Sequence, residues 1–220
     1  MTIEPVAFFR SPFKEKFGIP RQAGLAPDLP GEVRFVPPYD SPDAVRGLEG
    51  FDYCWLLWGF SLNPGGSGAL TVRPPRLGGN ERVGVFASRS PFRPNGLGLS
   101  CVRIGSVEPG VLQVFGADLA DGTPVYDVKP YVEYADSKSG VRCGFVDRNA
   151  WEPLEVVFPA ALESELQPEL LGALRQVLGQ DPRPQYQEDA GRLYGMSFGG
   201  FEIKFNVSGG KLFVRSVEKH

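Results

Sequence analysis

Glycine and proline punctuate this chain throughout, and they limit the length of its regular elements. The 28 Gly and 21 Pro make up more than a fifth of the 220 residues. Up to about residue 131 they separate short runs of β-branched and aromatic residues, a pattern typical of strands joined by tight turns. Short strands at this spacing predict an antiparallel β-barrel or sandwich. The runs are Ile3–Arg10, Glu32–Val36, Tyr53–Phe60, Arg82–Ser88, Leu97–Ser106 and Val111–Ala117.

Two of these runs differ in pattern. Val111–Phe115 alternates apolar and polar residues, as a half-buried strand does. Tyr53–Phe60 is apolar throughout and predicts a central strand that is buried on both faces. No strand is followed by a GxGxxG turn, and strands and helices do not alternate, so a Rossmann cofactor domain is not expected.

The pattern changes after about residue 147. Leucines recur every four residues between Ala161 and Gln180, which predicts a helix that Pro168 either splits or begins anew. Phe201–Val207 and Lys211–Val217 then alternate with period two around a Ser-Gly-Gly turn and predict a hairpin. We therefore expect a mainly β chain with a β-barrel domain at residues 1–148 and a smaller α+β domain at residues 149–220.

The composition excludes several chemistries. His220, the last residue, is the only histidine in the sequence, so a Ser-His-Asp triad, a Cys-His pair and a histidine-bound metal are not expected. The three cysteines form no CxxC pair and predict reduced, mostly buried thiols. The sequence shows neither a signal peptide nor an apolar run of about 20 residues, so we expect a cytoplasmic protein without metal or membrane contact.

Charge is distributed unevenly along the chain. The net charge of −3 by itself argues against nucleic-acid binding. Residues 1–103, however, carry 12 Lys and Arg against 9 Asp and Glu, and residues 71–103 contain six arginines and a single acid, Glu81. A basic surface, if present, is therefore local and made of arginine.

Four segments have compositions unusual for simple connectors: residues 10–24, 71–80, 84–100 and 118–131. Parts of them have plain structural readings, because Asp-Gly at 121–122 is a common β-turn and residues 77–80 suit a hairpin loop as well as an anion-binding nest. Arg73, Arg89 and Arg93 lie beside or one residue from proline, which restricts the backbone and holds the guanidinium in a fixed direction. A fixed arginine favours a carboxylate or phosphate partner.

Taken together, these motifs resemble the TsaA-like family of TrmO-type tRNA methyltransferases over nearly the whole chain. Several motifs of five to ten residues in the right order make a specific signal. They are Arg10-Ser-Pro-Phe-Lys-Glu-Lys-Phe with Pro20-Arg-Gln, Asp43-Ala-Val-Arg-Gly-Leu-Glu49, Val72-Arg-Pro-Pro-Arg-Leu-Gly-Gly-Asn80, Gly84-Val-Phe-Ala-Ser-Arg-Ser-Pro-Phe-Arg-Pro-Asn95, Asp118-Leu-Ala-Asp-Gly-Thr-Pro124 with Asp127-Val-Lys-Pro-Tyr131, and Gln180-Asp-Pro-Arg-Pro-Gln-Tyr186.

The resemblance implies an antiparallel β-barrel that binds S-adenosyl-L-methionine, usually as a dimer with the cofactor near the subunit interface. The implied substrate is threonylcarbamoyladenosine at tRNA position 37, methylated on its exocyclic nitrogen. The family often has a histidine after the Tyr53–Phe60 strand, where this chain has Ser61 and Leu62, so no catalytic residue is assigned. The implied cofactor contacts are Arg21, Gln22, Ala23, Ser61, Leu62, Arg89, Leu99, Asp118, Leu119, Ala120 and Asp121.

Transfer from a sulfonium requires neither metal nor imidazole, since the electrophile arrives activated and positioning does most of the work. For the tRNA anticodon loop we expect contacts from Arg73, Arg76, Arg93, Lys129, Arg183 and Tyr186. Phe92 is a further stacking candidate, with core packing as the alternative. We also expect loss of the second domain to impair tRNA methylation more than cofactor binding. Two other readings stay open: a methyltransferase with a small-molecule acceptor, and a non-enzymatic cofactor- or RNA-binding module.

Overall fold

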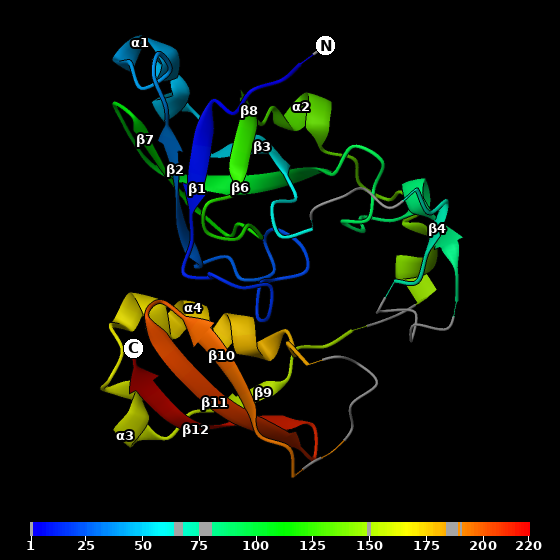
Figure 1. Ribbon diagram of the computed structural model, residues 1–220, viewed down its shortest axis with the longest axis vertical. Coiled ribbons are helices and arrows are strands. Elements are labelled where there is room, and N and C mark those ends of the chain that lie inside the picture. The colour runs from blue at the N-terminus through cyan, green and yellow to red at the C-terminus, as the bar shows by residue number, and fades with distance from the viewer. Residues whose placement is uncertain (1, 64–67, 75–80, 149–150, 184–188, 190) are drawn as a thin grey trace.

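The computed structural model describes residues 2–63, 68–74, 81–148, 151–183, 189 and 191–220 (Figure 1). Two bodies follow one another along the chain: a barrel above, and a sheet with a helix below. No helix within these residues is both long and apolar enough to cross a bilayer.

The first body is a closed barrel in which every neighbouring pair of strands is antiparallel. Its strand order is β1-β2-β7-β6-β3-β8. The expected antiparallel β-barrel is therefore confirmed. The strands are β1 (Ala7–Arg10), β2 (Pro30–Phe35), β3 (Tyr53–Gly59), β6 (Leu97–Glu108), β7 (Val111–Phe115) and β8 (Pro124–Pro130).

Strand β3 corrects the expectation of a strand buried on both faces. Cys54 and Leu56 are fully buried inside the barrel, whereas Tyr53 on the outer face is 43% exposed. The side chains of a barrel strand alternate between interior and exterior. An apolar run in β3 therefore provides both the barrel core and an outer aromatic surface.

Other expected strands also changed. The run at Arg82–Ser88 forms only the short strand β5 (Val83–Gly84), paired with β4 (Thr71–Val72), followed by a 3-10 turn at Val85–Ala87. Strand β8 lies in a segment that the sequence marked only as functional, and it closes the barrel between β1 and β3. The remaining barrel-side helices are short: α1 (Pro42–Val45) and α2 (Glu133–Asp136).

The second body is a four-stranded sheet with α4 packed against it. Pro168 occupies the first turn of α4, and residues 209 and 210 both have positive φ in the tight turn of the β11–β12 hairpin, so the expected helix start and hairpin are confirmed. The sheet order is β10-β11-β12-β9, with β9 parallel to β12. The elements are β9 (Glu155–Val157), α3 (Ala160–Glu163), α4 (Pro168–Gly179), β10 (Tyr194–Phe198), β11 (Phe201–Ser208) and β12 (Lys211–Lys219).

The segment between β1 and β2, residues 11–29, connects the two bodies, and we call it the bridging loop. Phe13, Ala26 and Leu29 are buried in the same hydrophobic cluster as α4 and the second sheet. Figure 1 shows this blue segment lying between the barrel and α4. The Gly199 N–H donates to the Pro12 carbonyl at 3.0 Å, and Gln180 Nε2 donates to the Leu25 carbonyl at 3.1 Å. The core of the second body is therefore built partly from barrel-side sequence.

The three cysteines are free thiols at three levels of exposure. Cys54 is buried, Cys101 is half-buried and Cys143 is exposed, so the expectation of mostly buried thiols fails for Cys143. Burial, with a smaller contribution from Cys101, raises the pKa of Cys54 to about 12. Cys54 therefore behaves as a small apolar side chain in the barrel interior.

Candidate functional site

A cleft of about 440 Å³ opens where the bridging loop meets the ends of β3 and β6. This volume lies in the range of about 300–1,000 Å³ that is typical of small-molecule sites. The cleft brings together most of the predicted cofactor contacts, from five separate stretches of sequence. Those that line it are Arg21, Gln22, Ser61, Leu62, Arg89, Leu99, Asp118 and Ala120.

Three predicted contacts do not line the cleft. Leu119 is 1% exposed and packs in the barrel core. Ala23 lies beside the cleft, where its backbone N–H donates to the Asp118 carboxylate. Asp121 faces the start of the bridging loop instead.

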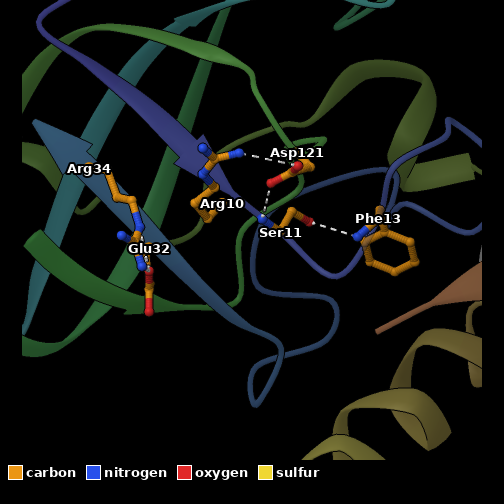
Figure 2. Close-up of polar contacts among 6 residues, drawn as sticks. All are labelled: Arg10, Ser11, Phe13, Glu32, Arg34 and Asp121. Carbon is orange, nitrogen blue, oxygen red and sulfur yellow. Dashed lines mark hydrogen bonds and ion pairs between the residues drawn. The ribbon is translucent and has the colours of Figure 1, made fainter. Parts of the chain in front are cut away.

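Asp121 fixes the point where the bridging loop leaves β1. Figure 2 shows its carboxylate accepting from the Ser11 N–H at 3.1 Å and pairing with Arg10 Nη1 at 3.5 Å. The Ser11 hydroxyl in turn accepts from the Phe13 N–H at 3.2 Å. These bonds direct Phe13 toward the second core, so the structure gives Asp121 a role in shaping the loop.

Asp118 is the only acidic residue among the described residues that line the cleft. Burial raises the pKa of its carboxyl above the usual range, while hydrogen bonds from Ser100 and from backbone N–H groups, and the charge of Arg89, act in the opposite direction. A partly desolvated carboxylate next to an arginine suits a polar or cationic ligand.

Arg89 joins two of the segments that form the cleft. Its Nη1 donates to Gln22 Oε1 at 2.5 Å, across 67 residues of sequence. The guanidinium is exposed on the rim, where a planar donor is suited to pairing with a carboxylate. The cleft therefore has a cation, Arg89, at its rim and a carboxyl group, Asp118, at its back.

Sequence reasoning missed the aromatic wall of the cleft. Trp55, Trp58 and Phe60 line it, with the rings of Trp58 and Phe60 packed edge to face at 4.4 Å between centroids. Thr123 also lines it, with its hydroxyl 3.3 Å from that of Ser61. The position of the Tyr53–Phe60 run directly before Ser61 and Leu62 was the signal that could have revealed the wall.

The structure describes four of the six predicted tRNA contacts, and these four differ in their surroundings. Arg73 is exposed beside β4, and Lys129 is exposed but paired with Asp127 at 2.8 Å. Arg93 lines the cleft and donates to the Ser88 carbonyl at 2.6 Å. Arg76 and Tyr186 lie outside the described residues.

Two further tRNA candidates differ in accessibility. Arg183 makes two hydrogen bonds of 2.8 Å to Asp181, and its side chain is 15% exposed. Phe92 is 50% exposed and belongs to neither hydrophobic cluster, so the core-packing alternative is excluded. Phe92 therefore remains available for stacking, whereas Arg183 is largely committed to Asp181.

Comparison with known proteins places the chain in a family. The sequence profile of the tRNA-methyltransferase O N-terminal domain matches residues 8–137, and that of the TrmO C-terminal domain matches residues 151–220. The chain belongs to the tRNA-methyltransferase O family. The TrmO family thus contains both the barrel and the second sheet described above.

Individual TrmO relatives are similar over nearly the full length. The tRNA (adenine(37)-N6)-methyltransferase of Escherichia coli (strain K12) is 40% identical over 227 residues, covering 98% of this chain and 97% of the relative. A Pseudomonas aeruginosa (strain PAO1) protein, whose name refers to S-adenosylmethionine-dependent methyltransferase activity, is 42% identical over 212 residues and covers 93% and 92%. The crystal structure of TrmO from Pseudomonas aeruginosa superposes with a TM-score of 0.82 at 34% identity, covering 99% and 98%.

Proposed function

We propose that this protein methylates the exocyclic nitrogen of threonylcarbamoyladenosine at position 37 of tRNA, with S-adenosyl-L-methionine as the methyl donor. The observation that carries the proposal is the cleft itself. It combines eight of the predicted cofactor contacts with an aromatic wall, a rim arginine and a half-buried carboxylate. Membership in the TrmO family supports the same reaction class.

The side chains of the cleft fit the chemical groups of this cofactor. Arg89 is placed to pair with an amino-acid carboxylate, and Asp118 to accept from ribose hydroxyls or an ammonium group. Trp58 and Phe60 offer an apolar surface for a purine ring. When bound, the cofactor supplies a methyl group already activated by its sulfonium sulfur. The protein's task is then to hold donor and acceptor in line and to exclude water.

We further propose that residues 1–148 form the methyltransferase domain and that residues 149–220 contribute to tRNA binding in a cytoplasmic homodimer. Arg73 and Phe92 are exposed and are the favoured contacts to phosphate and to an unpaired base. Arg93 supports the rim, because its guanidinium donates to the Ser88 carbonyl. Size-exclusion chromatography with light scattering tests the dimer.

Nucleoside mass spectrometry tests the reaction. The purified protein is incubated with labelled cofactor and bulk tRNA from cells that lack this modification. We expect label in threonylcarbamoyladenosine and none in tRNA made without the threonylcarbamoyl group. Equal labelling of unmodified transcripts would contradict the proposed substrate, and the absence of cofactor binding by calorimetry would contradict the proposed enzyme.

The small-molecule alternative is favoured by the net charge of −3. Salt separates the two readings, because contacts to phosphate release counterions. For a tRNA substrate we expect affinity to fall steeply between low and physiological salt. A flat response, together with turnover on a free nucleoside, would favour the small acceptor.

A further inference from the structure

Three side chains form a hydrogen-bonded line at the back of the cleft. Trp58 Nε1 donates to Ser100 Oγ at 2.9 Å, and Ser100 Oγ donates to Asp118 Oδ1 at 2.5 Å. We propose that Trp58 and Ser100 are positioning residues that hold the Asp118 carboxylate as an oriented acceptor for polar groups of the cofactor, an inference that rests on the proposed function. Neither residue was among the contacts that the family resemblance implied.

The polarity of this line follows from the chemistry of the indole. An indole N–H donates and has no lone pair with which to accept. Its bond to Ser100 therefore uses a lone pair of the hydroxyl, and the single hydroxyl proton is left for Asp118. The two hydrogen bonds therefore run in one direction only, from Trp58 through Ser100 to Asp118, which is the final acceptor.

Strand register fixes the geometry of the line. Trp58 of β3 lies opposite Gly98 of β6, and Ser100 follows two residues later on the same face. A Cβ atom on Gly98 would lie 2.4 Å from Cε2 of Trp58, so the indole packs where residue 98 has no side chain. Trp58 and Ser100 are 6% and 2% exposed, which keeps water from competing for these bonds.

The charges that face Asp118 favour the same role. Its carboxylate also accepts from the Ala23 N–H, and Arg89 is the charged group that acts on it across the cleft. The other charged residues that line the cleft are cations as well: Lys16, Arg21 and Arg93. Donors and cations thus offset part of the effect of burial, which raises the pKa of the Asp118 carboxyl.

Calorimetric titration with S-adenosyl-L-methionine between pH 5 and pH 8 tests the line. We expect Ser100→Ala to weaken binding about tenfold at neutral pH, the typical effect of losing a hydrogen bond to a charged group. The pH below which binding is lost should rise by about one unit, since the lost donor favoured the ionised carboxylate. Ser100→Thr keeps the hydroxyl and should stay close to wild type at every pH.

Two variants guard against a merely structural effect. Trp58→Phe keeps an aromatic ring near Gly98 but loses the N–H together with part of the indole surface. Because the N–H is gone, it should shift the pH profile in the same direction as Ser100→Ala even if the latter folds poorly. Ser106→Ala removes a hydroxyl from an exposed part of the same strand and should change neither affinity nor pH profile. Unchanged pH profiles in both Ser100→Ala and Trp58→Phe would overturn the proposal.

A second measurement separates this inference from the proposed function. Titration of ¹³C-labelled aspartate by NMR in the cofactor-free protein follows the Asp118 carboxyl, assigned by its loss in Asp118→Asn. The line predicts a higher Asp118 pKa in Ser100→Ala than in wild type. If the two proteins differ in this way but the wild type binds no cofactor, the proposed function alone is refuted. Cofactor binding without any such difference would refute the line alone.

Discussion

Gly18 of the bridging loop packs directly against Met196 of strand β10. A Cβ atom at Gly18 would lie 2.1 Å from Sδ of Met196, and Gly18 adopts a φ of +94°. Met196 is 2% exposed. The loop that carries Arg21 and Gln22 into the cleft therefore packs on the core of the second body at a position where any side chain would have to displace Met196.

We expect Gly18→Ala to destabilise the protein by about 2–4 kcal/mol, because a methyl group there is both strained at positive φ and crowded against Met196. Cofactor affinity should fall as well, because the bridging loop would have to move away from Met196. Urea unfolding and calorimetry measure the two effects. The matched control is Gly47→Ala, because Gly47 has a φ of +89° with no neighbour within 4 Å of an added Cβ atom and is not among the residues that line the cleft. Equal destabilisation in both variants would show that the Met196 contact contributes nothing.

Asp118 is expected to lower the stability of the cofactor-free protein at neutral pH. Its folded pKa is raised, so its stabilising contribution is present below the unfolded pKa and is lost as pH rises through the folded pKa. Asp118→Asn cannot ionise, and it should raise the melting temperature at pH 8 by about 2–4 °C, as about 1 kcal/mol does in a chain of this size. This gain in melting temperature should shrink toward pH 4. The same variant should also lose cofactor binding.

Thermal melts across this pH range provide the measurement for Asp118→Asn. Asp52→Asn, at an exposed position, is the control and should leave the melting temperature unchanged. A lower melting temperature for Asp118→Asn at every pH would mean that the ionised carboxylate is a net stabiliser in the absence of cofactor.

The cysteines should react in order of exposure. At pH 8 we expect a thiol reagent to modify Cys143 first, Cys101 slowly and Cys54 only after unfolding, because thiolate and access are both needed. Peptide mass spectrometry after timed labelling gives the order, and urea-unfolded protein should label at all three sites. Rapid modification of Cys54 in the native protein would be inconsistent with a closed barrel.

Packing changes what removal of residues 149–220 is expected to do. From the sequence we expect the deletion to impair tRNA methylation more than cofactor binding. In the structure, however, the deletion would expose Phe13, Ala26 and Leu29 of the bridging loop. We therefore expect cofactor affinity to fall as well, by at least about tenfold, the effect of 1.4 kcal/mol of lost loop order. Calorimetry on residues 1–148 tests this. Wild-type affinity in the shortened chain would show that the barrel orders the loop unaided.

Local patterns predicted much of this structure, and long-range packing accounts for the rest. The alternation at Val111–Phe115, the first-turn position of Pro168 and the Gly-Gly hairpin all appear as expected, because each depends on neighbours in sequence. Strand β9 could not be predicted, since its three residues gain their pairing from β12, more than 50 residues later. Arg82–Ser88 has strand-like composition but pairs over only two residues.

The same distinction applies to the site. Motif resemblance selected Arg89 and Asp118, which contact a shared cleft, but also Leu119 and Asp121, whose side chains leave in other directions. Motifs are contiguous, whereas a barrel strand or turn directs successive residues to different sides. Trp58 and Ser100 were missed for the opposite reason, because their partnership exists only once β3 and β6 are in register.

The seating of the bridging loop also constrains how this architecture can be recombined. If residues 149–220 were exchanged between homologues or fused to a foreign barrel, their core would have a cavity at the places that Phe13 and Leu29 fill here. Residues 11–29 must therefore be exchanged together with residues 149–220, although they precede that segment by more than a hundred positions. A barrel that dispenses with the tail must instead carry side chains at positions 13 and 29 that tolerate water.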